Sequence, residues 1–466
     1  MSTNLKPLFI LPDHANQRAL LMSQSDGWSL LACEITRPDG SEAAGMGYFN
    51  TVLKAELGID VTIRYLTDWP DPEIDDVVIV FTLENHSPDW ELSNDGRWID
   101  RNELDSLTFI RPLHRSLLES WFAEAKAEPL VPWWGIGWFA EVTSWMTEQL
   151  RGMGISITAP VEQVRIWHGS TILRVTTDAG DVYLKAVAHT FAQEAELMQM
   201  IARWQPERIP NILAVEPERH WILMQDIGGR DLGETSEIAA WEETLRAYAQ
   251  LQMRSLAFMD QLLSVPLCDW RLKPMENTIE TVVAQAPLLL QDHPMCPSEA
   301  DLAHWQKLLP DIKAVCVAAS GYNIPCTLEH GDFHDGMNIR VTEKGPVFYD
   351  WAESSISHPF FSLVELLLSE NLPNVPDVKA RLRDAYLTEW TAYEPLERLQ
   401  ELYQLTERLR ILHWTLHFAH QLATYQQCLA DRPILPYSVT EFAIRHAQGI
   451  VADLFKDLFS NANEAA

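Results

Sequence analysis

Acidic and amide side chains gather in one part of this chain. Residues 329–341 read EHGDFHDGMNIRV, and residues 350–353 read DWAE. An apolar run follows the first group, and another precedes the second, so the two runs predict a hairpin. Such a hairpin would bring Asp332, Asn338 and Asp350 to one edge. These residue types suit phosphoryl transfer, in which one carboxylate accepts a hydroxyl proton, while an amide oxygen and a second carboxylate hold Mg²⁺ on nucleotide phosphates.

The same residues resemble the motifs of the aminoglycoside phosphotransferase and choline kinase family, a branch of the protein-kinase-like fold. The HGD tripeptide at 330–332, followed by Asn338, looks like the catalytic loop of that family, and Asp350 looks like its metal-binding aspartate. The resemblance implies Asp332 as the catalytic base. It also implies Asn338 and Asp350 as Mg²⁺ ligands and Glu353 as an auxiliary acidic group at the metal.

One departure from the family pattern leaves two interpretations open. Five residues, 333–337, separate Asp332 from Asn338, whereas the family has four. Gly336 would help to absorb the extra residue as a bulge. The extra residue could also displace Asn338 by about an ångström, which is costly in catalysis. The sequence therefore allows either a competent enzyme or a catalytically silent nucleotide-binding or regulatory pseudokinase.

The elements that would complete a nucleotide site precede this loop. The apolar run 182–187 predicts a strand that contains Lys185, and residues 190–204 have the apolar spacing of a helix that carries Glu194. The resemblance assigns Lys185 to the nucleotide phosphates and Glu194 to the salt bridge that holds it. A lysine in a buried strand is otherwise hard to explain, although an edge-strand lysine that reaches solvent is the alternative.

Two loops are further candidates for nucleotide binding. The segment WHGST at 167–171 lies where a phosphate-covering loop would be, and the backbone N–H groups of Gly169 and Ser170 are suited to phosphate oxygens. An ordinary hairpin turn fits these residues equally well. Farther on, a predicted strand leads into Gln225 and a glycine pair, which in the family is the interlobe hinge whose backbone binds adenine. The predicted cofactors are therefore ATP and Mg²⁺.

Residues 1–127 predict a separate α/β domain. Apolar runs predict strands at 8–11, 19–23, 28–34, 61–66 and 77–83, and helices are expected at 42–57 and 113–126. The helix that ends at Gly58, together with residues 98–104, resembles a Nudix hydrolase fold. Aligned on Gly58, the chain keeps only Glu56 of that family's acidic cluster. The resemblance implies a Nudix-like domain without hydrolase activity that acts as a ligand sensor or docking module. A generic α/β cap domain is the alternative.

The order of the remaining elements predicts the rest of the fold. The Pro- and Gly-rich stretch 128–137 is a linker candidate. A bridging helix is predicted at 138–150, and apolar runs predict strands at 161–167, 172–176, 182–187, 212–216 and 221–224, before a mostly helical segment. This order predicts a kinase-like N-lobe with the bridging helix at 138–230 and a helical C-lobe with the catalytic loop at 231–466. The predicted fold class is α+β: a bilobal protein-kinase-like fold with a large helical C-lobe, preceded by a Nudix-like α/β domain.

Composition limits the class of partner. The chain has 466 residues and a formal net charge of −31, so it is poorly suited to nucleic acid or to an anionic membrane. No apolar run is long enough to span a membrane and no secretory signal is found, so a cytoplasmic protein is expected. The acidic balance and the family resemblance allow a small hydroxylated acceptor that is aminoglycoside-, choline- or sugar-like, including cationic ones. The sequence carries no signal for an oligomeric state.

Three histidines share one predicted helix face. His413, His417 and His420 follow i, i+4 and i+7 spacing, which can bind a metal. Their neighbours are mostly apolar, and no carboxylate is in register with them. The pattern therefore favours a packed helix, one that could line the acceptor pocket.

Overall fold

The structure is a computed structural model that describes residues 4–33, 35–36, 46–71, 76–87, 90, 92, 95–430 and 434–464. The chain divides into two compact units. The first comprises residues 1–189, 219–223 and 431–445, and the second comprises 190–218, 224–430 and 446–466. Strands and helices occur in both, so the predicted α+β class is confirmed. The domain boundaries at 127, 137 and 230 stay predictions, because the compact units follow packing and not sequence motifs.

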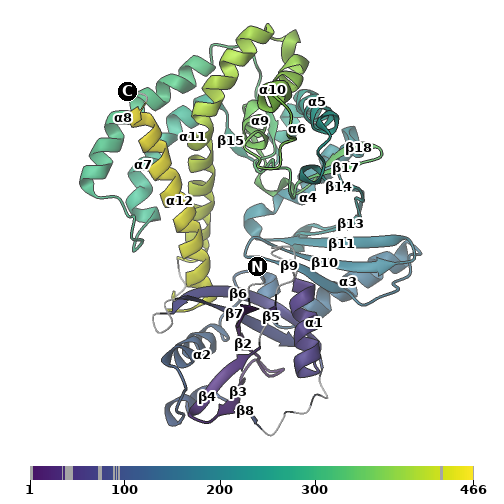
Figure 1. Cartoon of the computed structure of the whole chain (residues 1–466), viewed down its shortest axis with the longest axis vertical. Coiled ribbons are helices and arrows are strands. Elements are labelled where there is room, and N and C mark those ends of the chain that lie inside the picture. Colours follow the sequence, from purple (N-terminus) through teal and green to yellow (C-terminus); the bar gives the residue numbers. More distant parts are fainter. Residues whose placement is uncertain are drawn as a thin grey trace. The chain divides into compact units, whose positions relative to one another are not determined.

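A six-stranded mixed sheet begins the first unit (Figure 1). Its order is β6-β7-β2-β4-β3-β8, in which β2 is parallel to β7 and the other neighbours are antiparallel. The five predicted strands are all present in the described residues, and β6 extends five residues beyond its predicted end. Residue 34, the last of the predicted strand 28–34, lies outside the described residues. The strands are β2 (Leu8–Ile10), β3 (Ala19–Gln24), β4 (Gly27–Ala32), β6 (Val61–Asp71), β7 (Asp76–Asn85) and β8 (Gly96–Ile99), with a separate pair β1 (Asn4–Leu5) and β5 (Ile35–Thr36).

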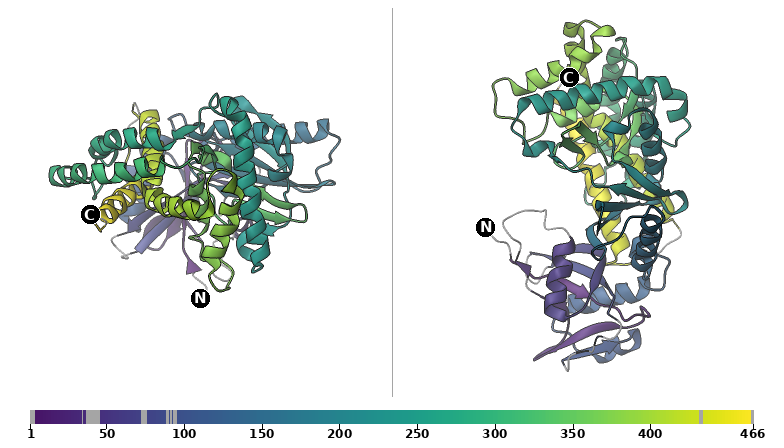
Figure 2. Two further views of the ribbon diagram at one scale, coloured as in Figure 1. Left: turned by 90° about the horizontal axis from the view of Figure 1, so that it is seen from above. Right: turned by 90° about the vertical axis from the view of Figure 1, so that its right-hand side faces the viewer.

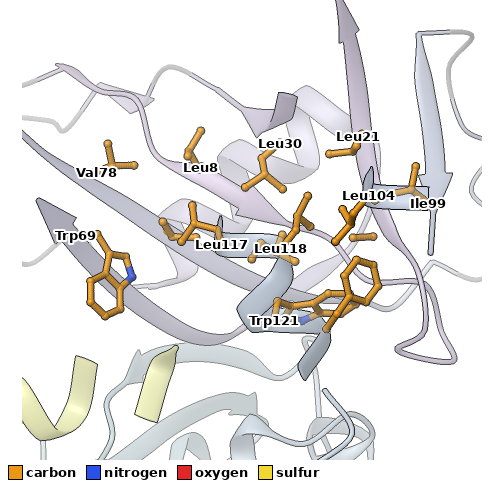
Figure 3. Close-up of a cluster of buried hydrophobic side chains, with 14 residues drawn as sticks. Leu8, Leu21, Leu30, Trp69, Val78, Ile99, Leu104, Leu117, Leu118 and Trp121 are labelled. Carbon is orange, nitrogen blue, oxygen red and sulfur yellow. The ribbon is translucent and has the colours of Figure 1, made fainter. Parts of the chain in front are cut away.

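Helices pack on both faces of this sheet. Leu118 of α2 joins Leu8 in a buried cluster on one face (Figure 3). Phe9 points to the other face because side chains alternate along a strand. There it stacks on Phe81, which contacts Phe49 of α1. The helices are α1 (Met46–Leu57) and α2 (Pro112–Glu124); residues 42–45 of the first predicted helix lie outside the described residues.

A β-bulge in β6 fastens this domain to the rest of the first unit. The register with β7 shifts between Ile63 and Tyr65, so Arg64 is the extra residue. The buried Arg64 guanidinium donates to the backbone O of Trp134 from Nε (2.7 Å) and from Nη2. Next to it, the Ile63 backbone N–H donates to Gln163 Oε1 (2.9 Å), and Gln163 Nε2 donates to the Ile63 O (2.7 Å). The bulge thus holds both the linker and the following sheet.

Residues 138–187 continue the first unit with a helix and three antiparallel strands. They are α3 (Trp138–Gly152), β9 (Glu162–Ile166), β10 (Ser170–Thr177) and β11 (Gly180–Val187), and they match the predicted bridging helix and three predicted strands. The strand β10 pairs with β9 and β11, and Trp221–Leu223 of β13 (Trp221–Gln225) lies on the other side of β11. The strand β11 is therefore an inner strand of this sheet.

A segment from the far end of the chain, residues 434–445, completes the core of the N-terminal domain. Trp69 of β6, labelled in Figure 3, lies edge-on to Tyr437 at 5.3 Å and to Phe442 at 6.3 Å between ring centroids. Both of these rings pack against the same buried cluster as α2. The fold of the first 127 residues is therefore closed by side chains that are distant in sequence.

The second unit is mostly helical. The helices α7 and α8 lie side by side, as do α5 and α10 (Figures 1 and 2). The helices are α4 (Gln193–Trp204), α5 (Ile238–Ser255), α6 (Met259–Leu262), α7 (Leu272–Leu289), α8 (Glu299–Ala319), α9 (Phe360–Leu366), α10 (Val378–Glu389), α11 (Leu396–Cys428) and α12 (Val439–Glu464), the last of which begins in the first unit. None of the described helices is long and apolar enough to cross a membrane.

Two small sheets interrupt the helices and carry the predicted catalytic loop. In one, β17 (Ile339–Thr342) pairs with β18 (Gly345–Phe348), so the predicted hairpin is confirmed. Its third strand is β14 (Arg230–Asp231), beside β17. In the other, β19 (Ser355–Ser357) lies between β15 (Cys268–Trp270) and β16 (Thr327–Glu329). The strand β12 (Ile212–Glu216) has its predicted bounds.

Candidate active site

The loop after β16 is anchored by His330 and Gly331. His330 is fully buried; its Nε2–H donates to the Tyr349 O at 3.0 Å, and its backbone N–H donates to the Tyr248 hydroxyl at 3.1 Å. Burial lowers the pKa of His330 to about 4, so its ring is neutral near pH 7. Gly331 has φ +87° and lies so close to the Glu353 backbone O that no side chain would fit. These contacts join the loop to the segment that follows β18.

Asp332 and Asn338 are joined directly. Asn338 Nδ2 donates to the backbone O of Asp332 at 2.6 Å and to its Oδ2 at 2.8 Å. The Asn338 side chain is buried, and the backbone N–H of Tyr349 donates to the backbone O of Asn338 at 3.1 Å. Asp350 follows Tyr349 in sequence. The hairpin therefore brings Asp332, Asn338 and Asp350 to one edge.

The extra residue of the loop is accommodated on the outside. Gly336 is exposed, and the Met337 side chain is 44 % exposed. Just before them, Asp335 is buried; its Oδ2 accepts from Asn371 Nδ2 at 2.9 Å, and its backbone O accepts from the Gly233 N–H at 3.1 Å. Because Asp335 is held inside, the added length projects outward, and Asn338 still reaches Asp332.

Negative charge surrounds the Asp332 carboxyl. Burial is the largest cause that raises its pKa, and the charges of Glu353 and Asp350 raise it further. His334, whose Nε2 lies 3.5 Å from Asp332 Oδ1, acts in the opposite direction, as does His330. Asp350 itself adopts the left-handed region at φ +64°, which is uncommon outside glycine and is typical of functional sites.

The histidine face of α11 contacts Glu353. His417 is buried, and its Nε2 lies 3.5 Å from Glu353 Oε2. Trp270 Nε1–H donates to His417 Nδ1 at 3.3 Å, and Gln421 Nε2 lies 2.7 Å from His417 Nε2. His413 instead stacks on Phe361 at 4.3 Å, as expected for a packed helix. In the part of the chain that the structure describes, no three His, Cys, Asp or Glu side chains are close enough to form a metal site by themselves.

Lys185 and Glu194 lie in different compact units, and their salt bridge stays a prediction. Lys185 is 5 % exposed and pairs with Ile172 across the β10–β11 ladder. Because β11 is an inner strand, the alternative of an edge-strand lysine that reaches solvent is wrong. Glu194 is fully buried in the first turn of α4. Both side chains are buried charges, which proteins retain only where they are compensated.

The two predicted nucleotide-binding loops have regular backbone bonds. At the turn into β10, the Trp167 N–H donates to the Ser170 O at 2.8 Å, and the Gly169 O accepts from Ala188 at 2.9 Å. At the end of β13, the Gln225 N–H donates to the Asn211 O at 3.0 Å, and Asn211 Nδ2 donates to Gln225 Oε1 at 3.1 Å. The roles of Gly169, Ser170 and Gln225 toward a nucleotide stay predictions.

A buried polar network behind the loop was not expected from the sequence. The Tyr248 hydroxyl, which accepts from His330, lies 2.8 Å from Ser362 Oγ, and Ser362 donates to Glu329. Burial raises the pKa of Glu329 to about 7. These residues come from α5, α9 and β16, and no local spacing relates them.

Comparison with known families identifies the kinase-like part of the chain. The model of the phosphotransferase enzyme family matches residues 161–402, a range that includes Lys185, Asp332, Asn338 and Asp350. The chain belongs to the phosphotransferase enzyme family. It is thus an enzyme of a family that transfers phosphoryl groups. The Nudix-like character of residues 1–127 is not confirmed and stays a prediction. No curated protein matches the chain.

Solved structures of phosphotransferases resemble this chain at low sequence identity. A choline kinase from Cryptosporidium parvum is 11 % identical, with 70 % of this chain and 99 % of that chain covered and a TM-score of 0.45. A choline/ethanolamine kinase family protein from Mesorhizobium loti is 18 % identical, with coverages of 70 % and 97 % and a TM-score of 0.45. An ADP-bound aminoglycoside phosphotransferase, APH(2'')-Ib, is 13 % identical, with coverages of 68 % and 99 % and a TM-score of 0.45.

Proposed function

We propose that this phosphotransferase moves the γ-phosphoryl group of ATP, in the presence of Mg²⁺, to a hydroxyl of a small molecule. The observation that carries the proposal is the pair of hydrogen bonds from the Asn338 amide to Asp332, on a hairpin whose second strand leads to Asp350. Family membership supports the same class of reaction.

The donor types at this edge fit Mg²⁺. Because Asn338 Nδ2 is engaged by Asp332, its amide oxygen is the atom suited to a metal, and Asp350 offers a carboxylate with Glu353 as an auxiliary one. Mg²⁺ prefers hard oxygen ligands and is usually held by one or two carboxylates plus substrate phosphates, so a closed protein cage is not needed. When bound, the ion would neutralise charge that develops on the phosphates.

The other assigned residues would bind the nucleotide and move the proton. Lys185, held by Glu194, would contact the phosphates, the backbone of Gly169 and Ser170 would cover them, and the segment at Gln225 would bind the base. Asp332 would orient the acceptor hydroxyl and take its proton. A raised pKa makes Asp332 a better proton acceptor than an ordinary carboxylate.

The surroundings of Asp332 favour a small acceptor. Residues 351–359 lie between Asp350 and α9, and within them β19 is buried and paired on both sides, by β15 and β16. A strand fixed in this way leaves no room for the peptide platform of a protein kinase. The charges of Glu353 and Asp350 close to Asp332 favour a cationic acceptor, as the acidic composition allows.

Calorimetric titration with a non-hydrolysable ATP analogue, with and without Mg²⁺, tests the proposal. We expect binding that requires Mg²⁺. An acceptor screen weighted to hydroxylated amines would follow, in which Asp332→Asn should keep the analogue affinity and lose turnover by about 10²–10⁴-fold. The matched control, Asp311→Asn on the exposed face of α8, should change neither. Folded wild-type protein that binds no analogue would overturn the proposal and leave the interpretation as a silent regulatory protein.

A further inference from the structure

The segment after β13 makes a tight turn against the catalytic hairpin. Gly228 and Gly229 both have positive φ, +66° and +69°, which two consecutive residues with side chains would rarely adopt. Gly229 lies against the Val341 backbone O, where a side chain would collide. The next two residues form β14, in which Arg230 pairs with Val341 and Asp231 pairs with Arg340. The turn is thus packed onto β17.

The Arg340 guanidinium holds this turn with all three of its nitrogens. Its Nε donates to the Gly228 O at 3.1 Å, its Nη2 to the Gly229 O at 3.3 Å and its Nη1 to Asp231 Oδ1 at 3.0 Å. The side chain is 29 % exposed, so these bonds are partly shielded from water. A lysine has one nitrogen at the end of a flexible stem and cannot serve three acceptors in the fixed geometry of a guanidinium.

The predicted metal ligand Asn338 directly precedes the same strand. Arg340 is two residues beyond Asn338, and between them the fully buried Ile339 pairs with the fully buried Phe348 of β18. Because peptide groups are planar, fixing the carbonyls of Gly228 and Gly229 also fixes the N–H groups that follow them. The Arg340 side chain therefore holds the backbone of the turn in a fixed orientation relative to the hairpin.

We propose that Arg340 is a positioning residue that orients the backbone of residues 226–229 for the nucleotide base relative to the hairpin that bears Asn338 and Asp350. This inference rests on the proposed function, because it takes the turn to be the segment that binds the base. Arg340 itself touches neither the base nor the phosphates in this scheme. Its removal should loosen nucleotide binding far more than it slows the chemical step.

The test compares Arg340→Met with Lys344→Met, which removes a positive charge from the exposed turn of the same hairpin. We expect Arg340→Met to raise the KM for ATP and the Kd of the ATP analogue about tenfold, with kcat at saturating ATP lowered less than about threefold. Arg340→Lys should resemble Arg340→Met, because charge alone does not restore the geometry. Lys344→Met should leave all three constants unchanged.

Hydrogen–deuterium exchange in the absence of nucleotide tests the positioning role of Arg340 separately from the proposed function. Peptides that cover residues 225–231 should exchange faster in Arg340→Met, while peptides of α7 and α8 remain as in the wild type. Unchanged exchange, or an unchanged KM in a variant that is folded and binds the analogue, would overturn the role of Arg340. Wild-type protein that binds no analogue would instead overturn the proposed function, and the positioning role with it.

Discussion

The Asn338 side chain has two tasks that a carboxylate could not combine. Its nitrogen donates twice to Asp332, and its oxygen is suited to a metal. In Asn338→Asp both donors are lost, and two like charges face each other. We expect kcat to fall about a hundredfold or more, because the orientation of Asp332 is lost. Steady-state kinetics over a range of Mg²⁺ concentrations measures this change.

Asn323→Asp is the matched control for that substitution, because it also places a carboxylate opposite another one, that of the buried Glu394, outside the loop that carries Asp332 and Asn338. It should lower stability without a comparable loss of kcat at saturating substrate. Equal losses of kcat in both variants would contradict the special position of Asn338.

Glu329 gives stability an unusual pH dependence. Burial raises its pKa to about 7 from an ordinary value of 4.5, so between these values the folded protein binds a proton that the unfolded chain has released. The contribution of Glu329 to stability therefore falls as pH rises through this window. Relative to Glu329→Gln, the wild type should lose up to roughly 3 kcal/mol between pH 4.5 and pH 8. Urea unfolding across this range measures the difference. The exposed substitution Glu397→Gln should leave the profile of the wild type unchanged.

The loop between β16 and β17 contains one glycine that cannot be replaced without strain and one that can. Gly331 has φ +87° and contacts the Glu353 backbone, whereas Gly336 is exposed, and a Cβ added to it would lie 4.0 Å from the nearest atom, His334 Nδ1. Gly331→Ala should lower the free energy of unfolding by at least about 2 kcal/mol, because it adds both strain and a collision. Gly336→Ala should stay within about 0.5 kcal/mol of the wild type. Urea midpoints of the two variants decide whether this difference exists.

Local patterns predicted the elements better than the contacts between them. The strands 182–187 and 212–216 and the hairpin around Gly345 were predictable, because alternation and turn residues are local in sequence. The strands β14, β15, β16 and β19 have only two or three residues each, too few for a pattern. The proposed catalytic residues could be named from one motif, whereas the hydrogen bond from Arg340 to Gly228 and the contact of His417 with Glu353 join residues that no spacing relates.

Within the first compact unit, one glutamine joins the N-terminal domain to the next sheet. The Gln163 amide satisfies both backbone groups of Ile63, where the bulge in β6 interrupts the ladder with β7. In Gln163→Ala a buried donor and a buried acceptor lose their partner. We expect a loss of about 2–4 kcal/mol in the free energy of unfolding. Glu162→Ala, next to it on β9, removes only an exposed ion pair with Arg174 and should cost less than about 1 kcal/mol. Similar losses in both variants, measured in urea, would contradict this role of Gln163.

The packing of Tyr437 and Phe442 on Trp69 has a consequence for biosynthesis. A ribosome adds about 5–20 residues per second, so this segment is made roughly 15–60 s after the first 127 residues. During that interval the nascent N-terminal domain has an open apolar end at Trp69, where a chaperone can bind or a protease can cut. The N-terminal domain is thus completed only after most of the following chain has been made.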